Sequence, residues 1–140
     1  MRIVSVVLLL LVLLVMSNCQ KSKDARADDA AITAAEKWLA MVDSGDYAKS
    51  WNEAASIFKG AVDEQTWAKT AESIRKPLGK VLSREVESAQ YRTSLPGAPD
   101  GEYVVIRFKT EFENKKEAYE TVTPMKDKDG EWRVSGYYIN

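Results

Sequence analysis

The chain has 140 residues, with 20 Lys and Arg against 21 Asp and Glu, a single Cys and no His. This length bounds it to one domain, and the missing His excludes Ser-His, Cys-His and His-ligated metal chemistry. One Cys closes no intrachain disulfide and builds no thiolate zinc site. A net charge of -1 offers no basic stripe for nucleic acid. We therefore expect no nucleic-acid partner, no metal and no other cofactor.

The N-terminus predicts export. Residues 3–16 are apolar except for Ser5. As a helix they span about 21 Å, which is shorter than a hydrocarbon layer of roughly 30 Å. Residues 1–18 are therefore predicted to be a signal peptide rather than a transmembrane helix. Cys19 stands where the apolar run ends, and this pattern resembles the lipobox of bacterial lipoproteins, although Asn18 replaces the small residue usual before the Cys. The resemblance implies a lipid anchor at Cys19 that holds the protein on a membrane.

Two other outcomes remain open for this leader. A signal peptidase cut after Ala25-Arg26-Ala27 gives a soluble periplasmic or secreted protein, and an uncleaved leader gives a membrane anchor. All three outcomes place the domain outside the cytoplasm. The polar residues 19–29 predict a flexible tether, and residues 30–140 predict a single folded domain.

Helical periodicity predicts three helices in the first half of the domain. Their apolar stripes lie over residues 31–42, residues 47–58 and residues 67–78. Asp46 and Asp63 are the expected caps of the second and third helices, Gly60 ends the second, and Ile74 belongs to the third stripe. Each helix carries one Trp, which we expect in the core, with ligand stacking as the alternative.

From Lys80 onward the hydrophobic period changes to two, which predicts strands. The expected strands are residues 81–93, 102–112, 116–126 and 131–139, with a bulge near Glu87-Ser88 in the first. Turns are expected at Asn114-Lys115 and, as type I′, at Asp129-Gly130.

These turn positions predict the register and therefore the two faces of the sheet. Lys109 should pair with Glu120, Met125 with Val134, and Thr121 with Tyr138. The face expected under the helices contains Val104, Ile106, Phe108, Phe112, Met125, Trp132, Val134 and Tyr138. The face expected in solvent contains Tyr103, Arg107, Lys109, Glu111, Glu120, Arg133 and Tyr137. In this register no strand carboxylate points toward the helices.

The predicted fold class is α+β, with three N-terminal helices packed on one face of a four-stranded antiparallel curved sheet. This looks like the cone-shaped roll of the nuclear-transport-factor-2 and ketosteroid-isomerase superfamily. Residues 30–139 also resemble a bacterial family of secreted domains, the domain of unknown function 4019, through residues 38–47, Trp51, residues 77–79, 93–103, 120–123 and 132–139. The resemblance implies a fold and an exported location, and it brings no catalytic residue.

The predicted inner face also carries hydroxyl groups that could line a pocket. The expected lining residues are Thr110, Tyr119, Thr121, Thr123 and Tyr138, with Trp38 and Trp51 as walls. The alternative is that the same face is filled and encloses no cavity.

We interpret the protein as a non-catalytic, membrane-tethered binding or accessory domain of the bacterial cell envelope. Its partner would be an unknown protein or a small apolar ligand. One alternative is an enzyme with a cone-shaped pocket, which needs an inward acid. The other is an oligomerising structural module that uses Tyr103, Val105, Val122 and Tyr137 on the outer face.

Overall fold

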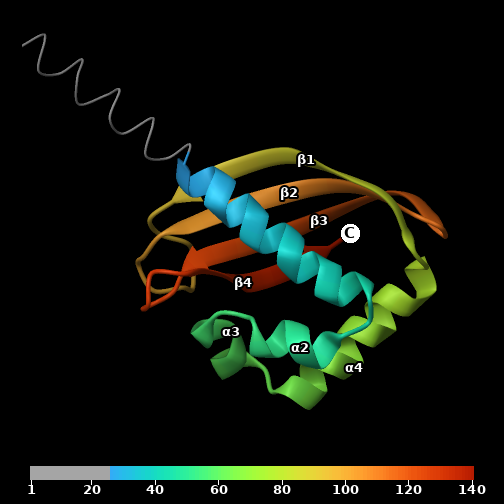
Figure 1. Cartoon of the computed structure of the whole chain (residues 1–140), viewed down its shortest axis with the longest axis horizontal. Helices are drawn as coiled ribbons and strands as arrows, with labels where there is room; N and C mark the ends of the chain where they lie inside the picture. The colour runs from blue at the N-terminus through green and yellow to red at the C-terminus, as the bar shows by residue number, and fades with distance from the viewer. Residues whose placement is uncertain (1–25) are drawn as a thin grey trace, which may run out of the picture.

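The computed structural model describes residues 26–140, in which a helical half precedes a four-stranded sheet (Figure 1). The first helix covers residues 26–43, followed by α2 (Tyr47–Asn52), α3 (Ser56–Ala61), α4 (Glu64–Arg75) and the 3₁₀ turn η1 (Lys76–Leu78). Strands β1 (Val81–Arg92), β2 (Tyr103–Phe112), β3 (Lys115–Lys126) and β4 (Trp132–Ile139) pair antiparallel in the order β1-β2-β3-β4. The predicted α+β class and its curved antiparallel sheet are confirmed, and the sheet is open.

The first helix buries the predicted apolar stripe against the sheet. Its buried members are Ala31, Ala35, Trp38, Leu39 and Val42. The helix already includes residues 26–29, which the sequence assigned to the tether. The signal peptide, Cys19 and the rest of that tether lie outside the described residues. Within the described residues, no helix is long and apolar enough to cross a membrane.

The single helix predicted from Asp46 to Gly60 is wrong, because α2 and α3 are separate. Asp46 does cap α2, accepting a hydrogen bond from the Lys49 N–H at 3.2 Å. Ala55 then adopts an extended conformation and donates its N–H to the Val134 carbonyl at 2.8 Å. This bond to β4 holds the break between the two short helices in place.

Helix α4 begins at its predicted cap, where Asp63 accepts from the Thr66 N–H at 2.9 Å. The predicted inward position of Ile74 is wrong, since Ile74 is 39% exposed and Arg75 is buried instead. A charged side chain takes this position because it meets two carboxylates there, as described below.

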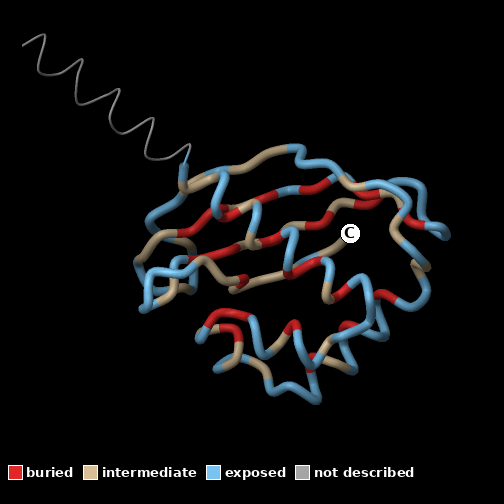
Figure 2. Tube along the Cα trace, in the orientation of Figure 1, coloured by how far each residue is buried: buried red, intermediate tan, exposed pale blue. Residues whose placement is uncertain are grey.

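The first helix crosses one face of the sheet and α2, α3 and α4 lie on the β4 side of it, with the main core between the helices and the sheet (Figures 1 and 2). The four strands lie within two residues of their predicted bounds at each end. A register shift between Val86 and Ser88 confirms the predicted bulge in β1. Local sequence patterns therefore predict the elements well, but the register differs.

The first predicted turn is displaced by one residue. Phe112 pairs with Lys115, so the turn is Glu113-Asn114 rather than Asn114-Lys115, and a further irregularity follows between Thr110 and Phe112. Along most of the hairpin Phe108, not Lys109, pairs with Glu120. The predicted register is wrong by one residue, and such a slip turns a whole strand over.

The slip exchanges the two faces of β3. Glu120 and Val122 are buried under the helices, whereas Tyr119, Thr121 and Thr123 share the outer face with Arg107 and Lys109. The predicted Lys109–Glu120 surface pair does not form, since Lys109 pairs with Tyr119 instead.

The second hairpin has a longer loop than predicted. Among the described residues only glycines have positive φ, so Asp129 excludes a type I′ turn, and the Asp127 N–H donates to the Glu131 carbonyl at 2.8 Å. Met125 therefore pairs with Arg133 rather than Val134.

An irregularity between Thr123 and Pro124 restores the predicted pairing of Thr121 with Tyr138. Because β3 is turned over, this pair faces outward. Tyr138 is 63% exposed, and Tyr137 points toward the helices instead.

The outer face has a small core of its own at one end. Tyr103, expected in solvent, is buried with Met125 and with Ala55 from the break before α3, and Leu95 and Ala98 of the 93–102 loop pack against this cluster. Its hydroxyl donates to the Pro99 carbonyl at 2.6 Å. The long loop therefore covers part of the face that the strand pattern assigned to solvent.

Candidate functional site

The predicted pocket residues do not come together. Trp38, Trp51 and Thr110 lie on the helix-covered side of the sheet. The other four predicted lining residues, Tyr119, Thr121, Thr123 and Tyr138, lie together on the outer face. The hydroxyl-rich patch therefore exists, but on the side of the sheet without helices.

The inner face is filled by aromatic side chains. The ring centroids of Trp38 lie 5.6 Å from Trp67 and 5.4 Å from Tyr137, and those of Phe58 and Trp67 lie 5.0 Å apart. Edge-to-face and tilted contacts at such distances are favourable packing arrangements.

Each helical Trp also has a partner for its indole N–H. Trp38 donates to the Ser50 carbonyl at 2.8 Å, Trp67 to the Ser50 Oγ at 2.9 Å, and Trp51 to the Val62 carbonyl at 2.7 Å. The tryptophans are thus core anchors, which agrees with the core interpretation.

The sequence prediction missed a buried carboxylate at the centre of the sheet. Glu120 is 0% exposed. Its Oε1 accepts from Arg84 Nε at 2.8 Å and from Thr110 Oγ1 at 2.7 Å, and its Oε2 accepts from the Tyr137 hydroxyl at 2.6 Å. A buried charge is tolerated when it is paired and hydrogen-bonded in this way.

A second carboxylate extends this cluster to the helices. Asp43, at the end of the first helix, accepts from Arg75 Nη2 at 2.6 Å and from both terminal nitrogens of Arg84 at 2.7 Å and 3.0 Å. We call this set of residues the Glu120 network: Asp43, Arg75, Arg84, Thr110, Glu120 and Tyr137. Its two Arg and two carboxylates balance in charge.

The network shifts the pKa values of Asp43 and Tyr137. Burial by itself raises the pKa of Asp43, but hydrogen bonds from Arg84 and Arg75 outweigh burial and hold that pKa below its usual range. Burial and the negative charge of Glu120 raise the pKa of Tyr137 well above its usual value. Tyr137 therefore stays a neutral hydrogen-bond donor at physiological pH.

The network has little room for a substrate. A surface hollow of about 430 Å³ reaches its rim at Asp43 and Arg75, but neither Glu120 nor Tyr137 lines it. Arg75 Nε and Nη1 are buried without hydrogen-bond partners, and Nη1 lies 4.0 Å from Glu120 Oε2. These contacts indicate a cluster that joins the two layers.

The sequence carried one signal for this inward carboxylate. Ala118 and Val122 flank Glu120 at a spacing of two, and both are buried. That alternation conflicts with the register taken from Asn114-Lys115, and the apolar alternation is the better guide here.

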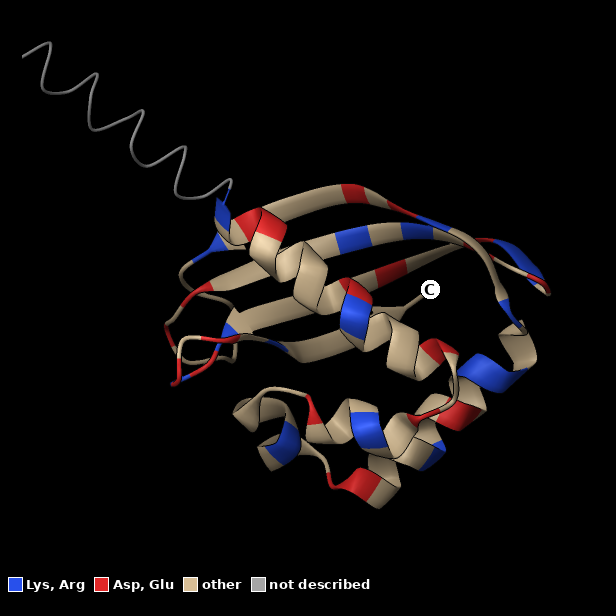
Figure 3. Ribbon diagram, viewed as in Figure 1, with Lys and Arg blue, Asp and Glu red and all other residues tan. Residues whose placement is uncertain are grey.

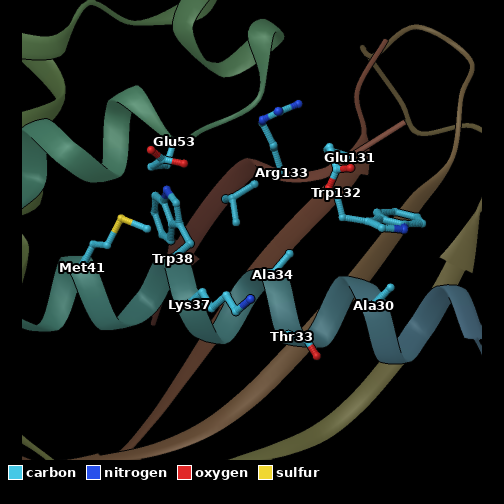
Figure 4. A pocket seen from close by; sticks show the side chains of 11 residues that line it. Ala30, Thr33, Ala34, Lys37, Trp38, Met41, Glu53, Glu131, Trp132 and Arg133 are labelled. Carbon is cyan, nitrogen blue, oxygen red and sulfur yellow. The ribbon is translucent and has the colours of Figure 1, made fainter. Parts of the chain in front are cut away.

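A surface groove of about 420 Å³ lies between the first helix and the start of β4 (Figure 4). We call it the Trp132 groove. It is lined by Ala30, Thr33, Ala34, Lys37, Trp38, Met41, Glu53, Glu131, Trp132, Arg133 and Val134. Small side chains at Ala30 and Ala34 leave space beside the half-buried Trp132.

Four charged side chains line this groove, but only one of them forms an ion pair. Arg133 is bound by Asp129 at 2.7 Å and 2.8 Å. Asp129, and more weakly Asp127 and Glu131, hold the pKa of Arg133 above its usual range. Within residues 26–140, the side chains of Lys37, Glu53 and Glu131 form no hydrogen bond or ion pair.

Residues 34–137 match the model of a protein family described as Protein of unknown function (DUF4019). The chain belongs to this family. All six residues of the Glu120 network lie inside the matched region of the DUF4019 domain, as does most of the Trp132 groove. Comparison with curated proteins gives no match.

The charges of the DUF4019 domain are mixed over helices and strands (Figure 3). Within the described part of the chain, no three His, Cys, Asp or Glu side chains converge as metal ligands would. The two features of the domain with unusual chemistry are therefore the Glu120 network and the Trp132 groove.

Proposed function

We propose that this DUF4019 protein is a membrane-tethered domain of the bacterial cell envelope that binds another molecule without transforming it. The observation that carries the proposal is the contrast between a filled interior and an open surface groove. Glu120 has hydrogen bonds to both oxygens, and aromatic rings occupy the space in front of the sheet. The Trp132 groove, by contrast, offers apolar surface that a ligand can reach.

The enzyme alternative gains an inward acid, but Glu120 does not line the hollows that reach other members of its network. The expectation that no strand carboxylate points inward was wrong, because Glu120 does. A general acid or base must reach a proton of the substrate. The carboxylate oxygens of Glu120 already accept hydrogen bonds from three side chains of the protein itself.

Most of the outer-face surface that the oligomerisation alternative requires is not exposed. Of the four outer-face residues that it needs, Val122 and Tyr137 point inward and Tyr103 is buried beneath a loop. Val105 alone remains half-buried on the outer face.

We place the domain on the outside of the membrane because of its N-terminal sequence. The apolar run at residues 3–16 and Cys19 at its end support lipidation, and the open curved sheet with helices on one face supports a fold similar to the nuclear-transport-factor-2 roll.

One experiment tests tethering and binding together. A photo-crosslinking residue replaces Lys37 in the groove or, as a control, Glu117 on the exposed outer face, and labelled fatty acid is supplied to the bacterial host. We expect the parent protein to carry the lipid label and Cys19→Ala to lack it. We also expect crosslinked adducts to form from position 37 but not from position 117. The variant Ser22→Ala should keep the label.

Two results would contradict the proposal. Equal labelling of Cys19→Ala and parent, or a mature N-terminus at Asp28, removes the lipid anchor. Crosslinks that form equally from positions 37 and 117, or from neither, remove the groove as the binding site.

A further inference from the structure

The Trp132 groove has a carboxylate at each end. Glu53 lies beside Trp38 at one end, and Glu131 lies beside Trp132 at the other (Figure 4). Both residues are exposed, and neither carboxylate is engaged in an ion pair. Arg133 is neutralised by Asp129, so Lys37 is the single uncompensated cation on the lining against two acids.

Between these ends the lining is mostly apolar, with Thr33, Lys37 and the paired Arg133 as its polar members. Ala30, Ala34 and Trp38 recur along one side of the first helix, and Val134 and Trp132 line the opposite wall. At about 1.5 Å per residue, the stretch from Ala30 to Met41 is about 16 Å long. This length matches about five residues of extended chain.

From this arrangement we infer that the groove binds a polypeptide segment in which apolar side chains are flanked at both ends by Lys or Arg. The apolar side chains lie on the alanine floor, and the two cations meet Glu53 and Glu131. A cation at the Glu131 end also lies close to an indole ring, which attracts positive charge. The inference rests on the proposed binding function and adds the chemistry of the partner.

Charge complementarity favours such a segment over a membrane surface as the occupant. A membrane rich in anionic lipid is repelled by Glu53 and Glu131, whereas a cationic peptide is attracted.

The test is a binding titration on the purified full-length protein in mild detergent, followed by the anisotropy of a labelled capped peptide. The probe has the sequence Lys-Leu-Phe-Leu-Lys. Its two controls are Glu-Leu-Phe-Leu-Glu, with reversed charge, and Lys-Ser-Ser-Ser-Lys, without apolar side chains. We expect the first peptide to bind about tenfold more tightly than either control. Its affinity should fall as the salt concentration rises from about 0.05 M to about 0.5 M.

Variants locate the binding. Glu53→Lys and Glu131→Lys should each lower the affinity for the Lys-bearing probe about threefold. The double variant should bind the Glu-bearing peptide more tightly than the Lys-bearing one. Glu36→Lys, exposed on the same helix but outside the groove, should have no effect. Ala30→Leu should fill the groove and abolish binding, whereas the exposed Ala40→Leu should not.

Each contrary result overturns a defined part of this inference. Equal binding of the Lys-bearing and Glu-bearing peptides, abolished by Ala30→Leu, refutes the charge recognition and leaves the proposed binding function intact. No binding of the Lys-bearing probe, while position 37 still forms crosslinks in cells, refutes the peptide class alone. A dimer in the peptide-free protein that Ala30→Leu dissociates shows that the occupant is a second copy.

Discussion

The side chain of Glu120 connects all four strands to one another and, through Arg84, to the first helix. It lies on β3 and receives hydrogen bonds from β1 through Arg84, from β2 through Thr110 and from β4 through Tyr137. Arg84 continues the cluster to Asp43 on the first helix. A buried carboxylate without such partners would cost several kcal/mol, so its position requires all of these contacts.

Replacement of Glu120 should therefore destabilise the protein strongly. Glu120→Gln keeps the shape of the side chain but removes one of the two carboxylates that pair with Arg84, so that two buried Arg share Asp43 alone. We expect a loss of about 3 kcal/mol in the free energy of unfolding. Urea unfolding followed by tryptophan fluorescence measures this loss. Glu117→Gln, exposed on the same strand, is the control and should change stability by less than about 0.5 kcal/mol.

If both Gln variants unfold at the same urea concentration, Glu120 is not held as a paired buried charge. In that case the register that places it under the helices is also in question, since the predicted register placed Glu120 in solvent.

At the scale of elements, helix α3 depends on a cap from a distant part of the chain. Asp127, in the β3–β4 loop, accepts from the Ser56 N–H at 3.0 Å and from the Ser56 hydroxyl at 2.8 Å. The residue that precedes α3 is Ala55, which has no side-chain oxygen to serve as a cap. The β-hairpin loop therefore supplies what the local sequence lacks.

Asp127→Ala should loosen α3 without unfolding the domain. The loss of a cap costs about 1 kcal/mol, and we expect the amide protons of residues 56–61 to exchange about fivefold faster with solvent. Hydrogen exchange read by NMR measures this effect. Asp129→Ala, in the same loop but bonded to Arg133 instead, should leave that exchange unchanged; faster exchange in both variants would mean that the loop as a whole, not the cap, holds α3.

The elements themselves could be predicted from sequence because their signals are local. The caps Asp46 and Asp63 and the period-two strands are each encoded within a few residues. The register was not encoded in the same way. The first loop, Glu113-Asn114, has no glycine to mark it, and Gly130 takes its positive φ in a loop longer than a two-residue type I′ turn. Bulges also add residues at points that no local pattern marks. A shift of one residue was enough to hide Glu120 and to expose Tyr138.

The two candidate sites were harder to predict from the sequence than the register, because each is formed by residues that only the folded chain brings together. The Glu120 network joins residues from Asp43 to Tyr137, and the Trp132 groove joins the first helix to β4 across most of the chain. Periodicity correctly predicted the class of the fold and favoured core positions for Trp38 and Trp51 over a role in ligand stacking. It could not show that Ala30 and Ala34 stand opposite Trp132, since this depends on how the helix crosses the sheet.

At the scale of the whole molecule, the helical layer and the sheet are held together by aromatic packing and by the Glu120 network. Of these two, the network alone responds to pH. In the folded state the pKa of Asp43 lies below its usual value, because hydrogen bonds from Arg84 and Arg75 outweigh the effect of burial. A carboxyl group with a lowered folded-state pKa binds protons more readily in the unfolded chain, so its contribution to stability is complete above the unfolded pKa of about 3.9 and is lost as pH falls further.

We therefore expect the melting temperature of the parent protein to stay constant between about pH 5 and pH 7 and to fall steeply below about pH 4. Asp43→Asn removes the titrating carboxylate and leaves Arg75 and Arg84 with a neutral partner. This variant should melt at a lower temperature than the parent at pH 7. The difference between the two proteins should narrow as the pH approaches 3, because the unfolded parent then takes up a proton at Asp43 and the contribution of this carboxylate to stability declines. Asp100→Asn, in the exposed 93–102 loop, is the matched control and should follow the parent at every pH. Differential scanning calorimetry over this pH range measures the effect, and a constant gap between Asp43→Asn and parent would show that Asp43 does not link the two layers through its charge.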